Sequence, residues 1–330
     1  MAVITRLTHS AVESILENYE VGRLIRLTPV AQGIENTNYF VQTSTSPDKN
    51  EVPSEFVLTV IEDDRLDQRE IMFQTLEACT DYGLPVARFV RTKEGNSLST
   101  FRDKAIMLSV RLSGRNVTAP ASEQCRAIGR FLSRMHHATD DLDAERFSYV
   151  RDAEWIQGTA TTVIGHLSPG DRLLLQTAVQ AVCAMLSRKD VQSLPQGVIH
   201  GDLFRDNALF NQFGLTGVVD FHHAAYGFRI YDVAVAVNDW CRSGDALDQR
   251  RTIALLQAYN QIRPFESEEY WFFDSFLLYA ALAFWLSRLS IAVQENLPDG
   301  QPVREPQEMK RLVQQHLSRP YRLHELALAS

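Results

Sequence analysis

The sequence predicts an α+β protein of two lobes, a small antiparallel β-rich lobe with one helix followed by a larger, mostly helical lobe. Two observations predict this order. Alternating apolar and polar residues, separated by turn signals, dominate the first third of the chain and are typical of hairpin-linked strands. Apolar residues at helical spacing dominate the rest. Ser113 and Gly114 are typical of a hinge, so we expect lobes at residues 1–112 and 113–330.

The strands of the first lobe are rich in Val, Ile, Tyr and Thr and are separated by short turns. Consecutive strands joined in this way form antiparallel pairs. The helix of this lobe ends at Gly83 and Pro85, which favour a stop. The predicted elements are strands at residues 22–30, 38–43, 55–61, 86–91 and 105–112 and a helix at residues 65–82.

The second lobe shows helical periodicity with one β-rich interruption. The predicted helices cover residues 122–137, 169–187, 231–241, 246–259, 268–293 and 305–317, and the β-rich interruption covers residues 197–221. Residues 270–293 are long and apolar enough for a membrane span, but they include Asp274 and Arg288. We therefore expect a buried helix of the core there.

Acidic residues outnumber basic residues by 41 to 33, which gives a formal net charge of −8. Such a surface repels nucleic acids and anionic lipids, so we expect neither nucleic acid nor a membrane as a partner. The first twenty residues lack the apolar run of a signal peptide, and the four cysteines form no CxxC pair. These features predict a cytoplasmic protein with reduced thiols.

One segment carries residue types that suit a specific chemistry. His200, Asp202 and Asn207 form the pattern HxDxxxxN, and Asp220 ends an apolar strand thirteen residues later. Phosphoryl transfer needs a carboxylate for the proton of the attacking hydroxyl and oxygen ligands for Mg²⁺. We expect Asp202 to be the base, Asn207 and Asp220 to hold the metal, and His200 to brace the loop. Asp and Asn also form ordinary turns and caps, but the full pattern is more specific than an isolated HxD.

At these residues the chain resembles the aminoglycoside phosphotransferase/choline kinase superfamily, and more closely its homoserine kinase family. The segments that carry the closer resemblance are 33–41, 56–59, 111–114, 200–207, 231–234, 238–241 and 284–289. The resemblance implies a two-lobed protein-kinase-like fold. It also implies ATP as co-substrate, Mg²⁺, and transfer of the γ-phosphoryl group to the hydroxyl of a small molecule, with L-homoserine of threonine biosynthesis as the leading acceptor.

The resemblance also indicates where the nucleotide would bind. The turn at residues 33–38 lies where a loop covering the phosphates belongs, although a turn with one glycine is equally typical of an ordinary hairpin. The strand at residues 105–112 should offer backbone groups to adenine. The expected nucleotide contacts are Gly33, Asn36, Asn38, Arg111, Leu112 and Leu209. Thr59 stands near the position where a protein kinase has its third-strand lysine, so the contact to the α- and β-phosphates is unassigned.

Homoserine is a zwitterion, so its site needs an acceptor for the ammonium group and a cation for the carboxylate. In the matching helical segments, Asp239 is the expected partner of the ammonium group and Arg288 of the carboxylate. Asp232 begins a helix, and we expect it to brace the catalytic loop by accepting backbone N–H bonds. His222 and His223 differ from the residues expected in the closer family, so the family fixes the chemistry better than the acceptor.

Several alternatives remain open on the sequence alone. The acceptor can be another amino alcohol, a choline-like molecule, a sugar, an aminoglycoside or a protein hydroxyl. The missing lysine is compatible with a nucleotide-binding pseudokinase, against which the retained acidic residues argue. A metal hydrolase has suitable ligand types in His200, Asp202, Asp220, His222 and His223. The two adjacent histidines would point to opposite faces of a strand, however, and this hypothesis leaves Asn207 unexplained.

Overall fold

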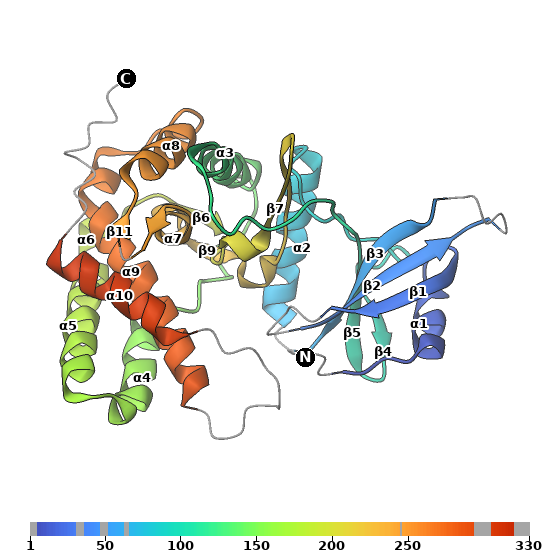
Figure 1. Cartoon of the computed structure of the whole chain (residues 1–330), viewed down its shortest axis with the longest axis horizontal. Helices are drawn as coiled ribbons and strands as arrows, with labels where there is room; N and C mark the ends of the chain where they lie inside the picture. The colour runs from blue at the N-terminus through green and yellow to red at the C-terminus, as the bar shows by residue number, and fades with distance from the viewer. Residues whose placement is uncertain are drawn as a thin grey trace. The chain divides into compact units, whose positions relative to one another are not determined.

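The computed structural model describes residues 5–30, 36–46, 52–62, 66–244, 246–293 and 305–319. Contacts between residues divide the chain into two units (Figure 1). The first holds the chain up to Leu66 together with Val86–Ser113, and the second holds Asp67–Pro85 and most of the chain from Gly114 onward. The first unit is mainly sheet and the second mainly helix, which confirms the predicted α+β class.

The first unit is built on a five-stranded antiparallel sheet in the order β1-β2-β3-β5-β4. Its elements are α1 (His9–Leu16), β1 (Arg23–Pro29), β2 (Thr37–Ser44), β3 (Ser54–Ile61), β4 (Ser99–Phe101) and β5 (Lys104–Val110). The register places Tyr39 opposite Leu58, and Leu58 opposite Leu108, so these side chains share one face. Helix α1 lies beside the sheet (Figure 1). Its Val12 and Ile15 belong to the same buried cluster.

Two elements of this unit differ from the prediction. The strand predicted at residues 86–91 is wrong, because this stretch pairs with β5 only through an isolated bridge between Phe89 and Ser109. Strand β4 forms the sheet edge beside β5 instead. Periodicity does not predict α1, since its eight residues span little more than two turns. Thr8 caps this helix by accepting a hydrogen bond from the Ala11 backbone N–H at 3.2 Å.

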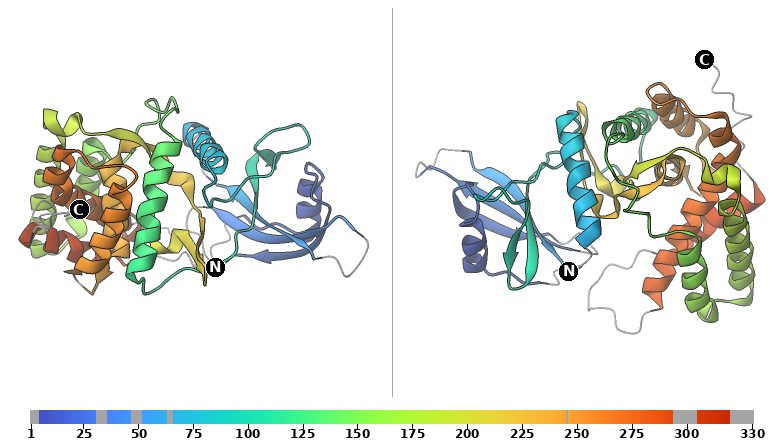
Figure 2. Two further views of the ribbon diagram at one scale, coloured as in Figure 1. Left: turned by 90° about the horizontal axis from the view of Figure 1, so that it is seen from above. Right: turned by 180° about the vertical axis from the view of Figure 1, so that it is seen from behind.

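The second unit is organised around the long helix α9. Its helices are α2 (Leu66–Asp81, whose first residue belongs to the first unit), α3 (Ser122–Ala138), α4 (Ala153–Val163), α5 (Pro169–Leu186), α6 (Lys189–Gln192), α7 (Arg229–Trp240), α8 (Gln249–Asn260), α9 (Ser267–Ala292) and α10 (Pro306–Ser318). Its strands are β6 (Gln196–Ile199), β7 (Ala208–Asn211), β8 (Gly214–Val218), β9 (Ala225–Phe228), β10 (Arg242–Ser243) and β11 (Ala246–Leu247). Helices α4, α5, α7 and α10 pack against α9 (Figure 2).

Most helix predictions in this unit are confirmed to within a few residues. These are the helices predicted at residues 122–137, 169–187, 231–241, 268–293 and 305–317. The helix predicted from residue 246 begins later, because Asp248 caps α8 by accepting from the Arg251 N–H at 2.9 Å. Helix α4 has no counterpart among the predicted elements.

Helix α9 is apolar on every side. Among the described residues it is the one helix that is long and apolar enough to cross a membrane, and 72% of its most apolar window is buried inside the protein. Phe273, Phe276 and Trp285 are fully buried. This burial agrees with the predicted core helix at residues 270–293.

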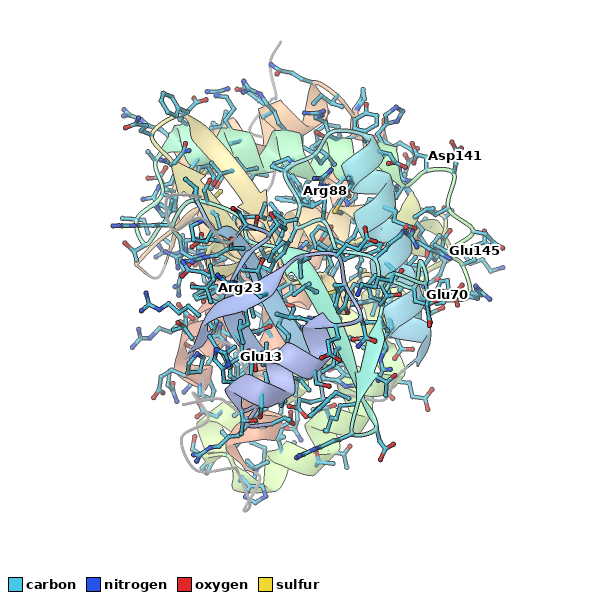
Figure 3. All side chains as sticks on the ribbon, turned by 90° about the vertical axis from the view of Figure 1, so that its right-hand side faces the viewer. Glu13, Arg23, Glu70, Arg88, Asp141 and Glu145 are labelled. Carbon is cyan, nitrogen blue, oxygen red and sulfur yellow. The ribbon has the colours of Figure 1, made fainter. Side chains whose placement is uncertain are left out.

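Helix α2 clusters with the second unit. Its Ile71 belongs to one buried cluster with Phe147 and Val198. Glu70 forms an ion pair with Arg146, and Figure 3 shows Glu70 beside the loop that carries Glu145. The predicted first lobe, residues 1–112, includes α2, whereas the contacts assign most of α2 to the second unit. The lobe boundary between residues 112 and 113 stays a prediction.

Candidate active site

The loop that carries the HxD residues lies in the second unit, between β6 and β7. Gly201 has a φ of +73°. A Cβ atom at this position would lie 2.9 Å from the carbonyl oxygen of His223 and 3.1 Å from the ring of Tyr149. Glycine meets both demands because it has no Cβ and adopts this φ without strain. The chain therefore turns sharply just before Asp202, which is half-buried.

Asp232, in the first turn of α7, holds this loop. Its carboxylate accepts the backbone N–H of His200 at 2.8 Å and that of Gly201 at 2.9 Å. It also accepts a hydrogen bond from Nε2 of His136 at 3.1 Å. Burial acts to raise the pKa of Asp232, but the bonds from His136 and from the His200 backbone outweigh it and hold the pKa below its usual value. A buried carboxylate therefore stays ionised under the loop.

His136, on α3, is the partner that reaches Asp232 from a distant element. Its side chain is fully buried, and burial lowers its pKa below the usual value, so the ring is neutral at pH 7. Nε2 then carries the proton donated to Asp232, and Nδ1 accepts from the Tyr259 hydroxyl at 2.8 Å. This tautomer satisfies both ring nitrogens.

His200 braces the loop from within. Its Nε2 donates to the carbonyl oxygen of Val219 at 3.2 Å, and its Nδ1 accepts from the backbone N–H of Asp202 at 3.3 Å. The ring is fully buried against Phe221, with 4.6 Å between the ring centroids. Both ring nitrogens of His200 therefore form hydrogen bonds to the backbone, as expected of a residue that supports the loop.

Asp202 and Asn207 lie together in the loop. Nδ2 of Asn207 donates to the carbonyl oxygen of Asp202 at 2.8 Å and to its Oδ2 at 3.0 Å. The backbone N–H of Phe204 also donates to the Asp202 carbonyl oxygen at 2.8 Å. The bond from Asn207 to Oδ2 orients the Asp202 carboxylate, as general-base catalysis on a hydroxyl would require.

Asp220 follows the strand β8 at the other side of the loop. The preceding residue, Val219, donates its N–H to the carbonyl oxygen of Asn207 at 2.9 Å and accepts from His200. Asp220 itself has φ 67° and ψ 62°, the left-handed conformation that is uncommon outside glycine. Its side chain is exposed. A left-handed backbone at a non-glycine residue, next to a residue fixed by hydrogen bonds, is typical of a functional position.

The donors of this site suit a hard cation. Because Asn207 directs its amide N–H groups at Asp202, its amide oxygen is the atom that faces other ligands, and Asp220 adds an exposed carboxylate. Oxygen donors of this kind fit Mg²⁺. In the described ranges no three or more His, Cys, Asp or Glu side chains gather into a metal cluster.

Of the residues expected to contact the phosphates, the structure describes Asn36 and Asn38. Gly33 lies outside the described residues. Asn36 is buried, and its Oδ1 accepts the backbone N–H of Glu62 at 3.0 Å. Asn38 is paired with Thr59 across β2 and β3, and its Oδ1 accepts the Thr59 hydroxyl at 2.7 Å. The position of the missing lysine is therefore part of a neutral hydrogen-bonded pair.

Arg111 belongs to a pocket of the first unit with a volume of about 220 Å³. The lining residues are Arg26, Thr28, Phe40, Gln42 and Arg111. The Arg111 guanidinium lies 3.9 Å from the ring centroid of Phe40 and 3.3 Å from Glu55. Leu112 follows it in the chain and is half-buried, and Leu209 is half-buried on β7 of the second unit.

The two residues expected at the acceptor are engaged elsewhere. Asp239 accepts three hydrogen bonds from Arg205, of which the backbone bond is 2.7 Å and the side-chain bonds are 3.0 and 3.1 Å. Arg288 donates to Glu308 at 2.6 Å and to the carbonyl oxygen of Glu305 at 3.0 Å. Asp239 therefore ties the catalytic loop to α7, and Arg288 ties α9 to the start of α10. As ligands of the acceptor they stay predictions.

Sequence reasoning missed two supporting residues of this site, His136 and Arg205. A histidine on the buried face of the helix at residues 122–137 is the signal that could have found the first. Arg205 lies inside the HxDxxxxN pattern, at a position the pattern leaves variable. Its partner Asp239 is 34 residues away, so only the folded chain reveals the pair.

Comparison with known sequences agrees with this geometry. A model of the phosphotransferase enzyme family matches residues 26–265. A homoserine kinase of Pseudomonas aeruginosa is 36% identical over 293 residues, which cover 88% of this chain and 89% of that enzyme. A homoserine kinase of Cupriavidus pinatubonensis is 33% identical over 325 residues, which cover 96% of this chain and 97% of that enzyme.

Solved structures of low sequence identity share the fold. The amicoumacin kinase hAmiN, in complex with AMP-PNP, Ca²⁺ and Ami, matches with a TM-score of 0.72 and 15% identity, over 97% of this chain and 98% of that one. A microcompartment-associated aminopropanol kinase matches with a TM-score of 0.70 and 18% identity, over 94% of this chain and 97% of that one. Both confirm the predicted two-lobed kinase-like fold.

Proposed function

Because this chain belongs to the phosphotransferase enzyme family, and within it to the homoserine kinases, we propose that it moves the γ-phosphoryl group of ATP onto the hydroxyl of L-homoserine. Its likeness to homoserine kinases along nearly the whole chain is the observation that supports this acceptor. The loop geometry around Asp202 and Asn207 supports the chemistry. The product would be O-phospho-L-homoserine, with ADP released.

Asp202 acts in this proposal as the base. Its carboxylate, oriented by Nδ2 of Asn207, accepts the proton of the acceptor hydroxyl as the oxygen attacks the γ-phosphorus in line. Asp232 and His200 hold the loop backbone, so the carboxylate needs little reorganisation during the step. Positioning of this kind supplies much of the catalysis in phosphoryl transfer.

Asn207 and Asp220 would hold Mg²⁺, which neutralises charge on the phosphates when bound. For the nucleotide we keep the predicted contacts at Gly33, Asn36, Asn38, Arg111, Leu112 and Leu209. Arg111 has the strongest support among them, since its guanidinium lines a pocket and stacks on Phe40. The cytoplasmic location stays a prediction.

ADP release from Mg·ATP tests the proposed acceptor directly. We expect turnover with L-homoserine well above that with 3-aminopropanol, choline, glucose or kanamycin. The reaction without an acceptor gives the background, and mass spectrometry of the product identifies the phosphorylated compound. Preferred turnover of another acceptor would overturn homoserine and point to His222 and His223 as a specificity change. ATP binding without turnover on any acceptor would favour a pseudokinase.

We expect Asp220→Ala to raise the Mg²⁺ concentration for half-maximal activity at least about 10-fold, because a charged oxygen ligand is lost. The measurement is a Mg²⁺ titration of both turnover and ATP binding. Asp141→Ala removes an exposed carboxylate elsewhere on the second unit and serves as the control (Figure 3). An unchanged titration in the Asp220 variant would remove this residue from the metal site.

A further inference from the structure

Helices α3 and α8 of the second unit pack closely against each other (Figure 1). A Cβ atom at Gly129, on α3, would lie 2.1 Å from the carbonyl oxygen of Leu255 and 3.2 Å from the backbone nitrogen of Tyr259, both on α8. Glycine fits this close approach because it has no Cβ. His136 follows Gly129 by about two helical turns, so it lies on the same face of α3. The glycine therefore brings α8 within reach of this histidine.

Tyr259 contacts His136 across this interface. Its hydroxyl is 2.8 Å from Nδ1 of His136, and the two rings meet edge to face with 5.7 Å between their centroids. Both side chains are fully buried. Burial raises the pKa of Tyr259, so the phenol keeps its proton at neutral pH. The hydroxyl is therefore a permanent hydrogen-bond donor to Nδ1.

Other residues hold Tyr259 in place. Its ring is stacked on that of Phe265, with 4.9 Å between the centroids and 20° between the planes. The guanidinium carbon of Arg263 lies 5.7 Å from the Tyr259 ring centroid. Arg263 in turn donates to both carboxylate oxygens of Glu269, at 3.1 and 3.2 Å, and Glu269 is fully buried. The stacked ring and the anchored guanidinium together restrict the Tyr259 side chain to the position in which it meets His136.

The hydrogen bond from Tyr259 selects the tautomer of His136. Because Nδ1 accepts, the ring proton is on Nε2, which donates to the Asp232 carboxylate at 3.1 Å. Burial lowers the pKa of His136, and the charges of Arg229 and Arg263 act in the same direction, against that of Asp232. The other neutral tautomer would present the lone pair of Nε2 to the carboxylate, which repels it. A donor at Nδ1 also polarises the ring and strengthens the bond from Nε2.

Asp232 connects this histidine to the catalytic loop. Its carboxylate accepts the backbone N–H groups of His200 and Gly201, directly before Asp202. A hydroxyl on α8, an imidazole on α3 and a carboxylate on α7 therefore form one continuous series of buried hydrogen bonds that ends at the loop backbone.

We propose, resting on the proposed function, that Tyr259 is a positioning residue for phosphoryl transfer, which fixes the orientation of Asp202 through His136 and Asp232. Tyr259 is fully buried and separated from the loop by two side chains. We therefore expect its hydroxyl to affect the reaction step and to leave the affinity for ATP and for the acceptor unchanged. Small displacements of a reacting group are enough to slow catalysis strongly.

A double-mutant cycle between Tyr259→Phe and Asp202→Asn tests this role. We measure single-turnover rates with Mg·ATP and L-homoserine, and KM for both substrates, in the wild type, the two single variants and the double variant. Phenylalanine keeps the ring stacked on Phe265 and removes only the hydroxyl. Tyr19→Phe is the matched control, because Tyr19 is buried in the first unit and its hydroxyl donates to Ser99 at 3.0 Å.

We expect Tyr259→Phe to lower the single-turnover rate by about 10-fold, with KM for ATP and for homoserine within about twofold of the wild type. In the Asp202→Asn background no base is left to orient, so the same substitution should change the rate by less than about twofold. Tyr19→Phe should stay within about twofold of its parent in both backgrounds. An equal 10-fold loss in both backgrounds would mean that Tyr259 is merely structural, and it would overturn the inference, as would an unchanged rate in Tyr259→Phe.

Nitrogen-15 NMR of the histidine rings in the wild type tests the contact even if Tyr259→Phe fails to fold. We expect the His136 ring, assigned through its contacts with the protons of the Tyr259 ring, to be the neutral Nε2–H tautomer at pH 7. An Nδ1–H tautomer or a charged ring would overturn the inference and leave the proposed function intact.

The acceptor and the inference are tested separately. If the wild type phosphorylates another acceptor instead of homoserine, the proposed acceptor is overturned, and the cycle measured with that other acceptor decides the role of Tyr259 by the same rates. Absence of turnover on every acceptor, or a wild-type rate in Asp202→Asn, would overturn the proposed reaction or its base, and this inference with it.

Discussion

Asp202→Asn is expected to lower kcat by about 10²–10⁴-fold while ATP binding stays close to that of the wild type, because general-base catalysis typically contributes this much. An asparagine keeps the shape of the side chain and still offers an oxygen to Nδ2 of Asn207, so the loop should retain its bonds. The variant loses the group that accepts the proton. Single-turnover kinetics with homoserine, together with calorimetry of ATP binding, measure the two effects separately.

Asp206→Asn provides the matched control for this substitution. Asp206 is an exposed carboxylate of the same loop, four residues from Asp202. Its replacement changes the charge of the loop by the same amount, and we expect a kcat within about twofold of the wild type, since exposed charges are strongly screened. A kcat for Asp202→Asn as close to the wild type as that of the control would exclude Asp202 as the base.

Asp232→Asn is expected to lower the free energy of unfolding by about 1–3 kcal/mol, the usual cost of leaving buried hydrogen-bond donors without an acceptor. The Asp232 carboxylate accepts N–H groups from His200, Gly201 and His136. An amide has one acceptor oxygen, and its NH₂ group would face an N–H donor. Because the same bonds shape the loop before Asp202, kcat should fall as well. Urea denaturation at pH 7 measures the stability.

The dependence of stability on pH follows from the pKa of Asp232, which folding lowers. A carboxyl with a lowered pKa contributes its full stabilisation above the unfolded pKa of about 3.9 and loses it as the pH falls through the lower folded pKa. Asp232→Asn removes this contribution. The difference in unfolding free energy between wild type and variant should therefore be largest at neutral pH and shrink under strongly acidic conditions.

An exposed ion pair supplies the control for the buried carboxylate. Glu123 contacts Arg126 at 3.3 Å, and the Glu123 side chain is 75% exposed. Surface pairs contribute at most about 1 kcal/mol, so Glu123→Gln should change stability little. Similar losses for Glu123→Gln and Asp232→Asn would contradict the role assigned to burial.

Local sequence patterns are enough to predict the class of chemistry and the order of the two lobes. Asp202 and Asn207 are five residues apart in one loop, so a local pattern is enough to place them together. Strand alternation and helical spacing are also local, and they predicted β1, β2, β3 and most helices of the second unit. Periodicity fails for short segments, because they contain too few residues to show a repeat. Helix α1 and the irregular stretch at residues 86–91 are examples.

The pairing of charged groups, in contrast, depends on how the chain folds. His136 meets Asp232 from 96 residues away, Arg205 takes Asp239, and Glu308 takes Arg288. Sequence periodicity and motif spacing do not predict these long-range contacts, because the contacts depend on how α3, α7, α9 and α10 pack in space. Local patterns therefore predict a base and two metal ligands, whereas packing decides which residues support them.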